Sequence, residues 1–235
     1  THCISSAASD VYKRQVLSSM PVTGALVLLS TLFTTVAVCV LATVAALNEG
    51  KAADHIIRTL STVGAAMPVF WLAIILITVF SVNLRWFPVG GIGRHGFLNS
   101  LILPAVTAAI VTAPVLVRSL RTQLLEVINA DFVTMLRING LSTARIMFRH
   151  ILPNAAIPTL ILLGINISGM LGGSIILERV FALPGIGSLL FDAIAKRDFP
   201  LIQTIALFSA LGVVVVSLLT DIAVRLLDPR ARAAR

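Results

Sequence analysis

The sequence predicts an all-α polytopic membrane protein with five transmembrane helices, on two observations. Hydrophobic residues fill 57% of the 235 positions and charged residues only 12%, with a mean hydropathy of +1.00, whereas an average soluble chain is about 25% charged. In addition, five runs of 22 to 27 residues contain no charged side chain, and about 20 apolar residues suffice for a helix to cross the hydrocarbon core. These runs are 22–47, 60–84, 96–117, 151–177 and 199–220.

Residues 1–15 differ from everything that follows them. They are polar, show no helical or strand period, and begin with Thr1 rather than Met. We expect a disordered or non-native terminus here, and one transmembrane domain over residues 16–235. A signal peptide is not predicted, because Lys13 and Arg14 follow polar residues and the next apolar run has spanning length.

The charges between the runs predict which loops share a side of the membrane. Eleven Lys and Arg residues fall in the loops 48–59 and 118–150 and in the tail after residue 220, against five in the loops at 85–95 and 178–198. Since Lys and Arg near span ends stay in the cytoplasm, we expect the first three segments, the C-terminus included, to be cytoplasmic. The net charge of +8 therefore reflects topology, and we expect no nucleic-acid partner.

The runs lack the side chains that membrane enzymes and ion-coupled carriers need. They contain no Asp, Glu, Lys, Arg or His, although carriers usually keep an ionisable group in the membrane. The sequence has no phosphate-binding loop, no nucleophile beside a base and no metal-ligand spacing, so we expect no catalytic residue and no metal site. The polar side chains inside one run are candidates for a substrate site, with close helix packing as the alternative: Asn166, Ser168 and Ser174.

The loop at 118–150 has a helical pattern that is interrupted by a glycine. Phe132, Met135 and Leu136 have the i, i+3, i+4 spacing of one helix face. Gly140 then breaks the pattern, and Ser142 is a candidate N-cap for a second helix. We expect a helix, a glycine turn and a helix that dock in the groove of a partner, with an amphipathic pair on the bilayer surface as the alternative.

The segment 181–200 is predicted to form an outer cap. Pro184, Gly185 and Gly187 form a tight turn, and the apolar stretch after it is too short to span and fits an interfacial helix. We expect this cap, with Asp198 near its end, to lie on the outer side of the membrane. A plain connector is the alternative.

The stretch DFVTMLRINGLSTARIMFRHILPNAAIPTL at 131–160 resembles the cytoplasmic motif of ABC-importer permeases, which reads Glu-Ala-Ala, three residues, Gly, nine residues, Ile-x-Leu-Pro. Gly140 matches the glycine and Leu152–Pro153 the end of that motif. Further segments are similar to the peptide-importer branch: Phe87–Val89, VFALPGIGSLL at 180–190, RDFPLIQ at 197–203 and LLDPRAR at 226–232. The resemblance implies an ATPase-coupling loop made of Asp131, Phe132, Thr134, Met135, Leu136, Arg137, Gly140, Leu141 and Ser142.

The resemblance is to the peptide/nickel permease group, B-type subunit, and it implies a type I ABC importer transmembrane domain in a bacterial or archaeal inner membrane. The implied partners are a second permease subunit, two ATPase subunits that bind the ATP and Mg, and an extracytoplasmic solute-binding protein, with no cofactor in this chain. On the same resemblance, we expect the cap at 181–200 to contact the binding protein or the mouth of the translocation path, for which Asn166, Ser168 and Ser174 are candidates. The implied substrates are peptides or related small solutes, nickel chelates included. Such subunits have six spans, so we expect this chain to lack the first span and an outer segment. A non-transporting scaffold or signalling subunit that docks a soluble partner through residues 118–150 is the alternative.

Overall fold

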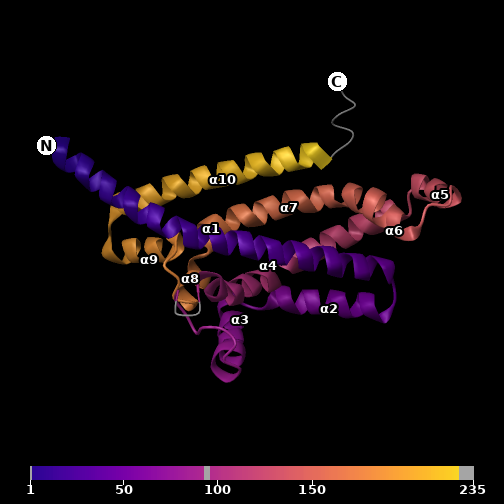
Figure 1. Ribbon diagram of the computed structural model, residues 1–235, viewed down its shortest axis with the longest axis horizontal. Coiled ribbons are helices and arrows are strands. Elements are labelled where there is room, and N and C mark those ends of the chain that lie inside the picture. Colours follow the sequence, from indigo (N-terminus) through magenta and orange to yellow (C-terminus); the bar gives the residue numbers. More distant parts are fainter. Residues whose placement is uncertain (1, 93–95, 228–235) are drawn as a thin grey trace. The chain divides into compact units, whose positions relative to one another are not determined.

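The computed structural model describes residues 2–92 and 96–227, and every regular element in those ranges is a helix (Figure 1). The elements are α1 (His2–Leu47), α2 (Ala52–Ala66), α3 (Val69–Leu76), the π-helix η1 (Ile77–Asn83), α4 (Phe97–Ile128), α5 (Asp131–Ile138), α6 (Thr143–Ile146), the π-helix η2 (Met147–Ile151), α7 (Leu152–Gly173), α8 (Ile175–Val180), α9 (Ile186–Lys196) and α10 (Phe199–Leu227). The all-α prediction is confirmed.

Within those ranges, four helical stretches are long and apolar enough to cross a membrane. They are Tyr12–Leu47, Phe97–Ile128, Thr143–Leu171 and Phe199–Leu226. Each contains most or all of one uncharged run, because a run of about 20 apolar residues without a strong breaker is most stable as a helix in lipid.

The run 60–84 is broken, although the sequence predicts one continuous span there. α2 ends at Ala66 and α3 begins at Val69, and Pro68 has extended backbone with φ −61° and ψ 132°. Proline offers no N–H to the helix and disfavours the helical conformation of the residue before it. The two pieces count together as a fifth candidate span, interrupted rather than continuous.

Two helices are longer than the uncharged runs predict. α4 continues to Ile128, so that the first third of the predicted loop 118–150 is helical. α1 begins at His2, so residues 2–15, for which the sequence predicts a disordered or non-native terminus, are helical. The chain contains no Gly or Pro before Pro21, and those are the residues that oppose a helix most strongly.

The structure divides into two compact units. One contains the residues up to Phe33, Met67–Ala109 and Ile167–Val215, and the other contains Thr34–Ala66, Ile110–Asn166 and the residues from Val216 on. In the first unit, Phe181 and Leu183 are buried in one cluster with Leu26 of α1 and Leu101 of α4. The segment that joins α8 to α9, which belongs to the predicted outer cap, is therefore part of this core.

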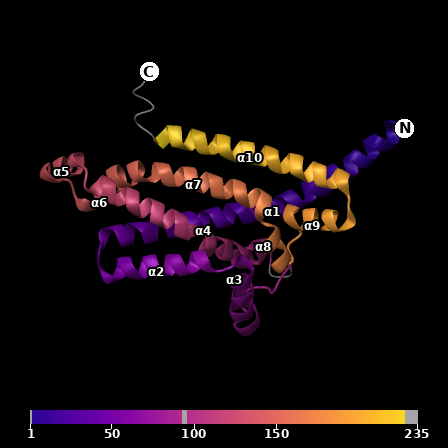
Figure 2. The same cartoon turned by 180° about the vertical axis from the view of Figure 1, so that it is seen from behind.

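The core of the second unit combines the C-terminal part of α1 with α2, α4, α5, η2 and α7. In both ribbon views, α2 runs back alongside the C-terminal part of α1 (Figure 2). Val133 of α5 and Ile146 of α6 are 0% and 2% exposed, and both lie in the same cluster as Leu120 and Leu124 of α4. The predicted docking segment thus shares one hydrophobic core with the helix that leads into it.

Candidate functional site: the loop between α4 and α7

The predicted helix, glycine turn and helix are present as α5, Gly140 and α6. Gly140 has a φ of +75°, a left-handed conformation that glycine adopts without strain. Its N–H donates to the carbonyl of Arg137 at 3.0 Å, and the N–H of Leu141 donates to the carbonyl of Leu136 at 3.3 Å. This pair of hydrogen bonds is a Schellman motif, so Gly140 ends α5 and reverses the chain.

The spacing of apolar residues on α5 assigns some of them to the wrong face. The sequence groups Leu136 with Phe132 and Met135, but Leu136 is half-buried and packs with Val133 against the core of the second unit. Leu141 packs there as well, because the Schellman turn brings the residue after the glycine back against Leu136.

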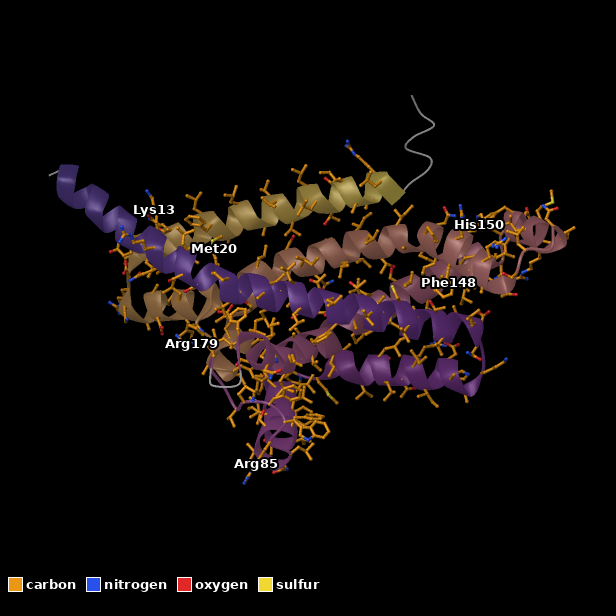
Figure 3. All side chains as sticks on the ribbon, viewed as in Figure 1. Lys13, Met20, Arg85, Phe148, His150 and Arg179 are labelled. Atoms are coloured by element: carbon orange, nitrogen blue, oxygen red, sulfur yellow. The ribbon has the colours of Figure 1, made fainter. Side chains whose placement is uncertain are left out.

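The face of α5 that stays exposed is still apolar. Phe132, Met135 and Ile138 are 43%, 65% and 76% exposed, and their spacing of three residues places them along one side of the helix. We call these three residues the α5 face. Ile138 is not part of the face predicted from the i, i+3, i+4 spacing. It lies six residues after Phe132 and three after Met135, and this spacing already places it on their side of the helix. Figure 3 labels another exposed apolar residue nearby, Phe148 of η2, which is 67% exposed.

The polar residues of the loop occupy positions that favour its helices. Asp131 lies in the first turn of α5 and Arg137 in its last turn, where their charges complement the helix dipole. Ser142 occupies the predicted N-cap position of α6, with extended backbone but without a side-chain capping hydrogen bond. Thr134 and Ser142 are exposed, as are Asp131 and Arg137, so all four are accessible to a partner.

An open hollow of about 1120 Å³ adjoins the α5 face. It is lined by Gln123, Glu126, Val127, Ala130, Phe132, Asn154, Ile157 and Pro158. Phe132 belongs both to the hollow and to the α5 face, so the apolar surface of the loop continues into a recess between the end of α4 and the start of α7. A partner element that covers the α5 face would also meet this recess.

A buried ion pair fixes α4 against α2 in the same unit. The Arg121 guanidinium donates from Nε and Nη2 to the two carboxylate oxygens of Asp54, at 2.7 Å each. The Asp54 side chain is 1% exposed and that of Arg121 16%, and the N–H of Gly50 adds a hydrogen bond at 3.2 Å. Such a bidentate pair is geometrically specific. The stretch of α4 that leads to the loop is therefore held in one register against α2.

The predicted outer cap contains a buried carboxylate that sequence reasoning missed. Glu178 is 0% exposed, and its carboxylate accepts hydrogen bonds from the Thr23 hydroxyl at 2.7 Å, the Ser174 hydroxyl at 2.7 Å and the Ser188 N–H at 2.8 Å. A Cβ on Gly185 would lie 2.4 Å from the Glu178 carboxyl carbon. Its position in the sequence could have indicated a buried site, because Glu178 directly follows the uncharged run 151–177 and is soon followed by Gly185 and Gly187, which leave space for a side chain.

The other residues predicted for the cap lie at or near the starts of α9 and α10. Gly185 is the N-cap residue of α9 and Pro184 is exposed beside it, while Gly187 lies inside α9. Asp198 accepts a hydrogen bond from the N–H of Leu201 at 3.2 Å and so caps α10. The expected short helix is α9, and Arg179 lies beside it (Figure 3), in an ion pair with Asp192.

The three polar candidates for the translocation path differ in exposure and in hydrogen bonding. Asn166 donates to the carbonyl of Leu162 at 2.9 Å, within its own helix. Ser174 is bound to Glu178 and is 3% exposed, while Ser168 is half-buried. The close-packing alternative is supported at a neighbouring glycine, because a Cβ on Gly164 would lie 2.4 Å from the Thr220 hydroxyl oxygen.

The chain resembles known transport proteins in sequence. Residues 39–233 match the family described as binding-protein-dependent transport system inner membrane component. A di/tripeptide transport system permease protein, DppB of Pseudomonas aeruginosa, is 37% identical over 217 residues, which cover 82% of this chain and 65% of that protein. An oligopeptide transport system permease protein, AppB of Bacillus subtilis, is 35% identical over 222 residues, covering 92% of this chain and 70% of that protein. This chain thus spans about two thirds of the length of these relatives.

The fold resembles solved ABC transporters. A chain of the methionine ABC transporter MetNI, in an inward-facing conformation, aligns with a TM-score of 0.73 at 17% identity, over 91% of this chain and 96% of that one. A chain of an amino acid ABC transporter, solved with histidines, aligns with a TM-score of 0.68 at 16% identity, over 93% and 97%. The expected fold, an ABC importer transmembrane domain, is confirmed.

Proposed function

We propose a function from one premise: this chain belongs to the family of binding-protein-dependent transport system inner membrane components. On that premise it is a membrane-spanning permease subunit that helps to form the translocation path of an ATP-driven importer. The observation that carries the proposal is the α5 face, an exposed apolar surface mounted on the core that joins α4 to α7.

The proposed partners follow from what this chain has and lacks. A second permease subunit would complete the path, an extracytoplasmic binding protein would deliver the substrate, and two ATPase subunits would bind the ATP and Mg. We propose peptides as the substrates, because the two relatives named above are a di/tripeptide and an oligopeptide permease. Nickel chelates and related small solutes remain within the same proposal.

The geometry suggests how force on the loop would reach the spans. A partner that binds Phe132 and Met135 also presses on Val133, which is packed against α4 and η2. Well-packed cores transmit strain rather than absorb it, so movement of α5 would be passed to α4 and α7. Closure of the ATPases would in this way tilt those helices between inward-open and outward-open arrangements.

A charge placed on the α5 face tests this role. We expect Met135→Glu, which keeps a good helix former, to weaken ATPase binding about tenfold or more, because interface anchors of this kind are the sites where truncation costs most. The measurement is the amount of ATPase that copurifies with the complete complex, together with peptide uptake per assembled complex. Ala52→Glu is the matched control, since Ala52 is exposed in the first turn of α2, where an added carboxylate is favourable.

Each outcome separates the proposal from the scaffold alternative. Loss of ATPase binding and uptake in Met135→Glu, with both retained in Ala52→Glu, supports an energy-coupled permease. Normal uptake in both variants contradicts the coupling role of α5. A complex that binds a soluble partner through α5 but takes up no peptide, with intact partner subunits, favours the scaffold.

We propose that the loop between α4 and α7 and the C-terminus are cytoplasmic, because positive charge gathers in those segments. The test uses a chain without Cys3 and Cys39, with one new cysteine at Arg145 or at Ala195, both exposed. A membrane-impermeant thiol reagent added to intact cells should label the cysteine at 195 and not that at 145. Labelling at 145 in intact cells overturns this topology.

A further inference from the structure

A second, polar hollow lies in the unit that contains α2 and most of the coupling loop. It has a volume of about 730 Å³ and opens between α2 and α4. It is lined by Ile57, Arg58, Ser61, Thr62, Val117, Arg118, Arg121 and Thr122. Three of these eight side chains are arginines, so the lining suits an anion rather than an apolar ligand. Three more carry hydroxyl groups, of which those of Thr62 and Thr122 donate to the carbonyls of Arg58 and Arg118 in their own helices.

The three arginines differ in their freedom to bind a ligand. Arg121 donates two hydrogen bonds to Asp54, which neutralise most of its charge and fix its position in the lining. Arg58 and Arg118 are exposed. Neither Arg58 nor Arg118 belongs to the ion pairs of Arg121 with Asp54 and of Arg179 with Asp192 among the described residues, although the charge of Arg58 also acts on Asp54.

The sequence places both free guanidinium groups at the border of the membrane. Arg58 lies two residues before the uncharged run 60–84, and Arg118 directly follows the run 96–117. Arginine side chains at the end of a span extend to the level of the headgroups. Two arginines from adjacent helices therefore converge on one hollow at the depth where lipid phosphates lie.

We propose that this hollow binds the phosphate of an anionic phospholipid headgroup, with Arg58 and Arg118 as its charged contacts. A guanidinium forms two parallel hydrogen bonds with a phosphate, and basic pockets between membrane helices bind such headgroups. The Ser61 hydroxyl at the rim can rotate to donate a further hydrogen bond. The Asp54–Arg121 pair sets the spacing of α2 and α4, and with it the width of the site.

The test measures phospholipid retained by the purified complete complex. The complex is reconstituted in nanodiscs of phosphatidylglycerol and phosphatidylcholine, extracted in detergent, and its bound lipids are counted by native mass spectrometry. We expect phosphatidylglycerol to be retained by the natural chain and to bind about tenfold more weakly when Arg58→Gln and Arg118→Gln are combined, because each arginine near the surface contributes to attraction of anionic lipid. The matched control combines Arg145→Gln and Arg149→Gln, which remove two exposed arginines outside the hollow.

The remaining arms decide which phosphate is bound and whether positive charge at residues 58 and 118 retains it. A combined Arg58→Lys and Arg118→Lys variant keeps both positive charges and should retain more lipid than the glutamine pair. Retention that is unchanged in the glutamine pair, or equally reduced in the Arg145 and Arg149 control, overturns the proposal. So does displacement by millimolar inorganic phosphate without retention of any lipid, because the ligand is then a soluble anion.

Discussion

The hydroxyl of Thr23 donates a hydrogen bond to Oε1 of Glu178 at 2.7 Å, joining residues that are 155 apart in the sequence. The same hydroxyl oxygen accepts the N–H of Ile186 at 2.8 Å. Both side chains are almost inaccessible, at 1% and 0% exposure. One threonine thus ties α1 to α8 and to the start of α9, which anchors the outer cap at its N-terminal end.

Removal of the Thr23 hydroxyl should loosen this anchor. We expect Thr23→Val to lower the free energy of unfolding by about 1–3 kcal/mol, because it leaves a buried N–H without an acceptor and a buried carboxylate without one of its donors. The measurement is unfolding of the purified protein in mixed detergent micelles. Thr204→Val is the control, since the Thr204 hydroxyl donates to the Pro200 carbonyl of its own helix, and a loss there should stay within about 0.5 kcal/mol. Equal effects of the two substitutions would show that the Thr23 contacts add nothing.

The glycine beside this carboxylate should not tolerate a methyl group. A Cβ on Gly185 would lie within 2.4–2.5 Å of the Glu178 carboxylate, so Gly185→Ala must displace the carboxylate from its three donors. We expect a loss of about 2 kcal/mol or more, in the range of buried hydrogen-bond networks and overpacked cores. Gly169→Ala is the contrast, because nothing lies within 4 Å of that position and alanine favours a helix. A melting temperature unchanged by Gly185→Ala would refute the close approach.

The sequence predicts the spans well because the requirement for a span is local. Length and lack of charge suffice, and four helical stretches contain most or all of an uncharged run, although the run 151–177 is interrupted after Gly173, where α7 ends. The break at Pro68 was not predicted, because an interrupted span has the same length and the same lack of charge as a continuous one. Glu178 was missed for a different reason, since its donor Thr23 belongs to a helix more than 150 residues earlier.

The apolar spacing on α5 predicts the helix but not which of its faces is buried. The spacing on α5 correctly predicted a helix that ends just before Gly140. Spacing says which residues share a face, but which face is buried depends on the neighbours, and Val133 with Leu136 met the side chains of α4 and η2. The exposed face is therefore Phe132, Met135 and Ile138, shifted by part of a turn from the predicted one.

The ion pair between α2 and α4 should depend on the shape of the arginine as well as on its charge. We expect Arg121→Lys to destabilise the protein by about 1–3 kcal/mol, because an ammonium group cannot reproduce the two parallel hydrogen bonds to Asp54. Asp54→Ala should cost more, since it leaves the arginine largely buried without a partner. The measurement is again unfolding in mixed micelles, with Arg137→Lys on the exposed surface as control. An Arg121→Lys variant as stable as the natural chain would contradict the bidentate geometry.

The turn at Gly140 should tolerate substitution according to backbone conformation and not according to size. A Cβ there meets nothing within 4 Å, so the cost arises from φ +75° alone. We expect Gly140→Val to destabilise the turn by about 1–2 kcal/mol and to reduce peptide uptake per assembled complex, whereas Gly140→Asn, which adopts this conformation readily, should stay close to normal. Uptake is normalised to the amount of complex in the membrane. Normal uptake per complex in Gly140→Val would mean that the turn has no part in coupling.

The continuation of α4 past its uncharged run has a mechanical consequence. From Arg118 to Ile128 the helix extends for 11 residues, or about 16 Å, with Leu120 and Leu124 packed along it. α5 follows at the end of this extension. An ATPase that binds α5, as proposed above, would therefore act on the end of a stiff lever arm, and a small displacement of α5 would reach the span as torque.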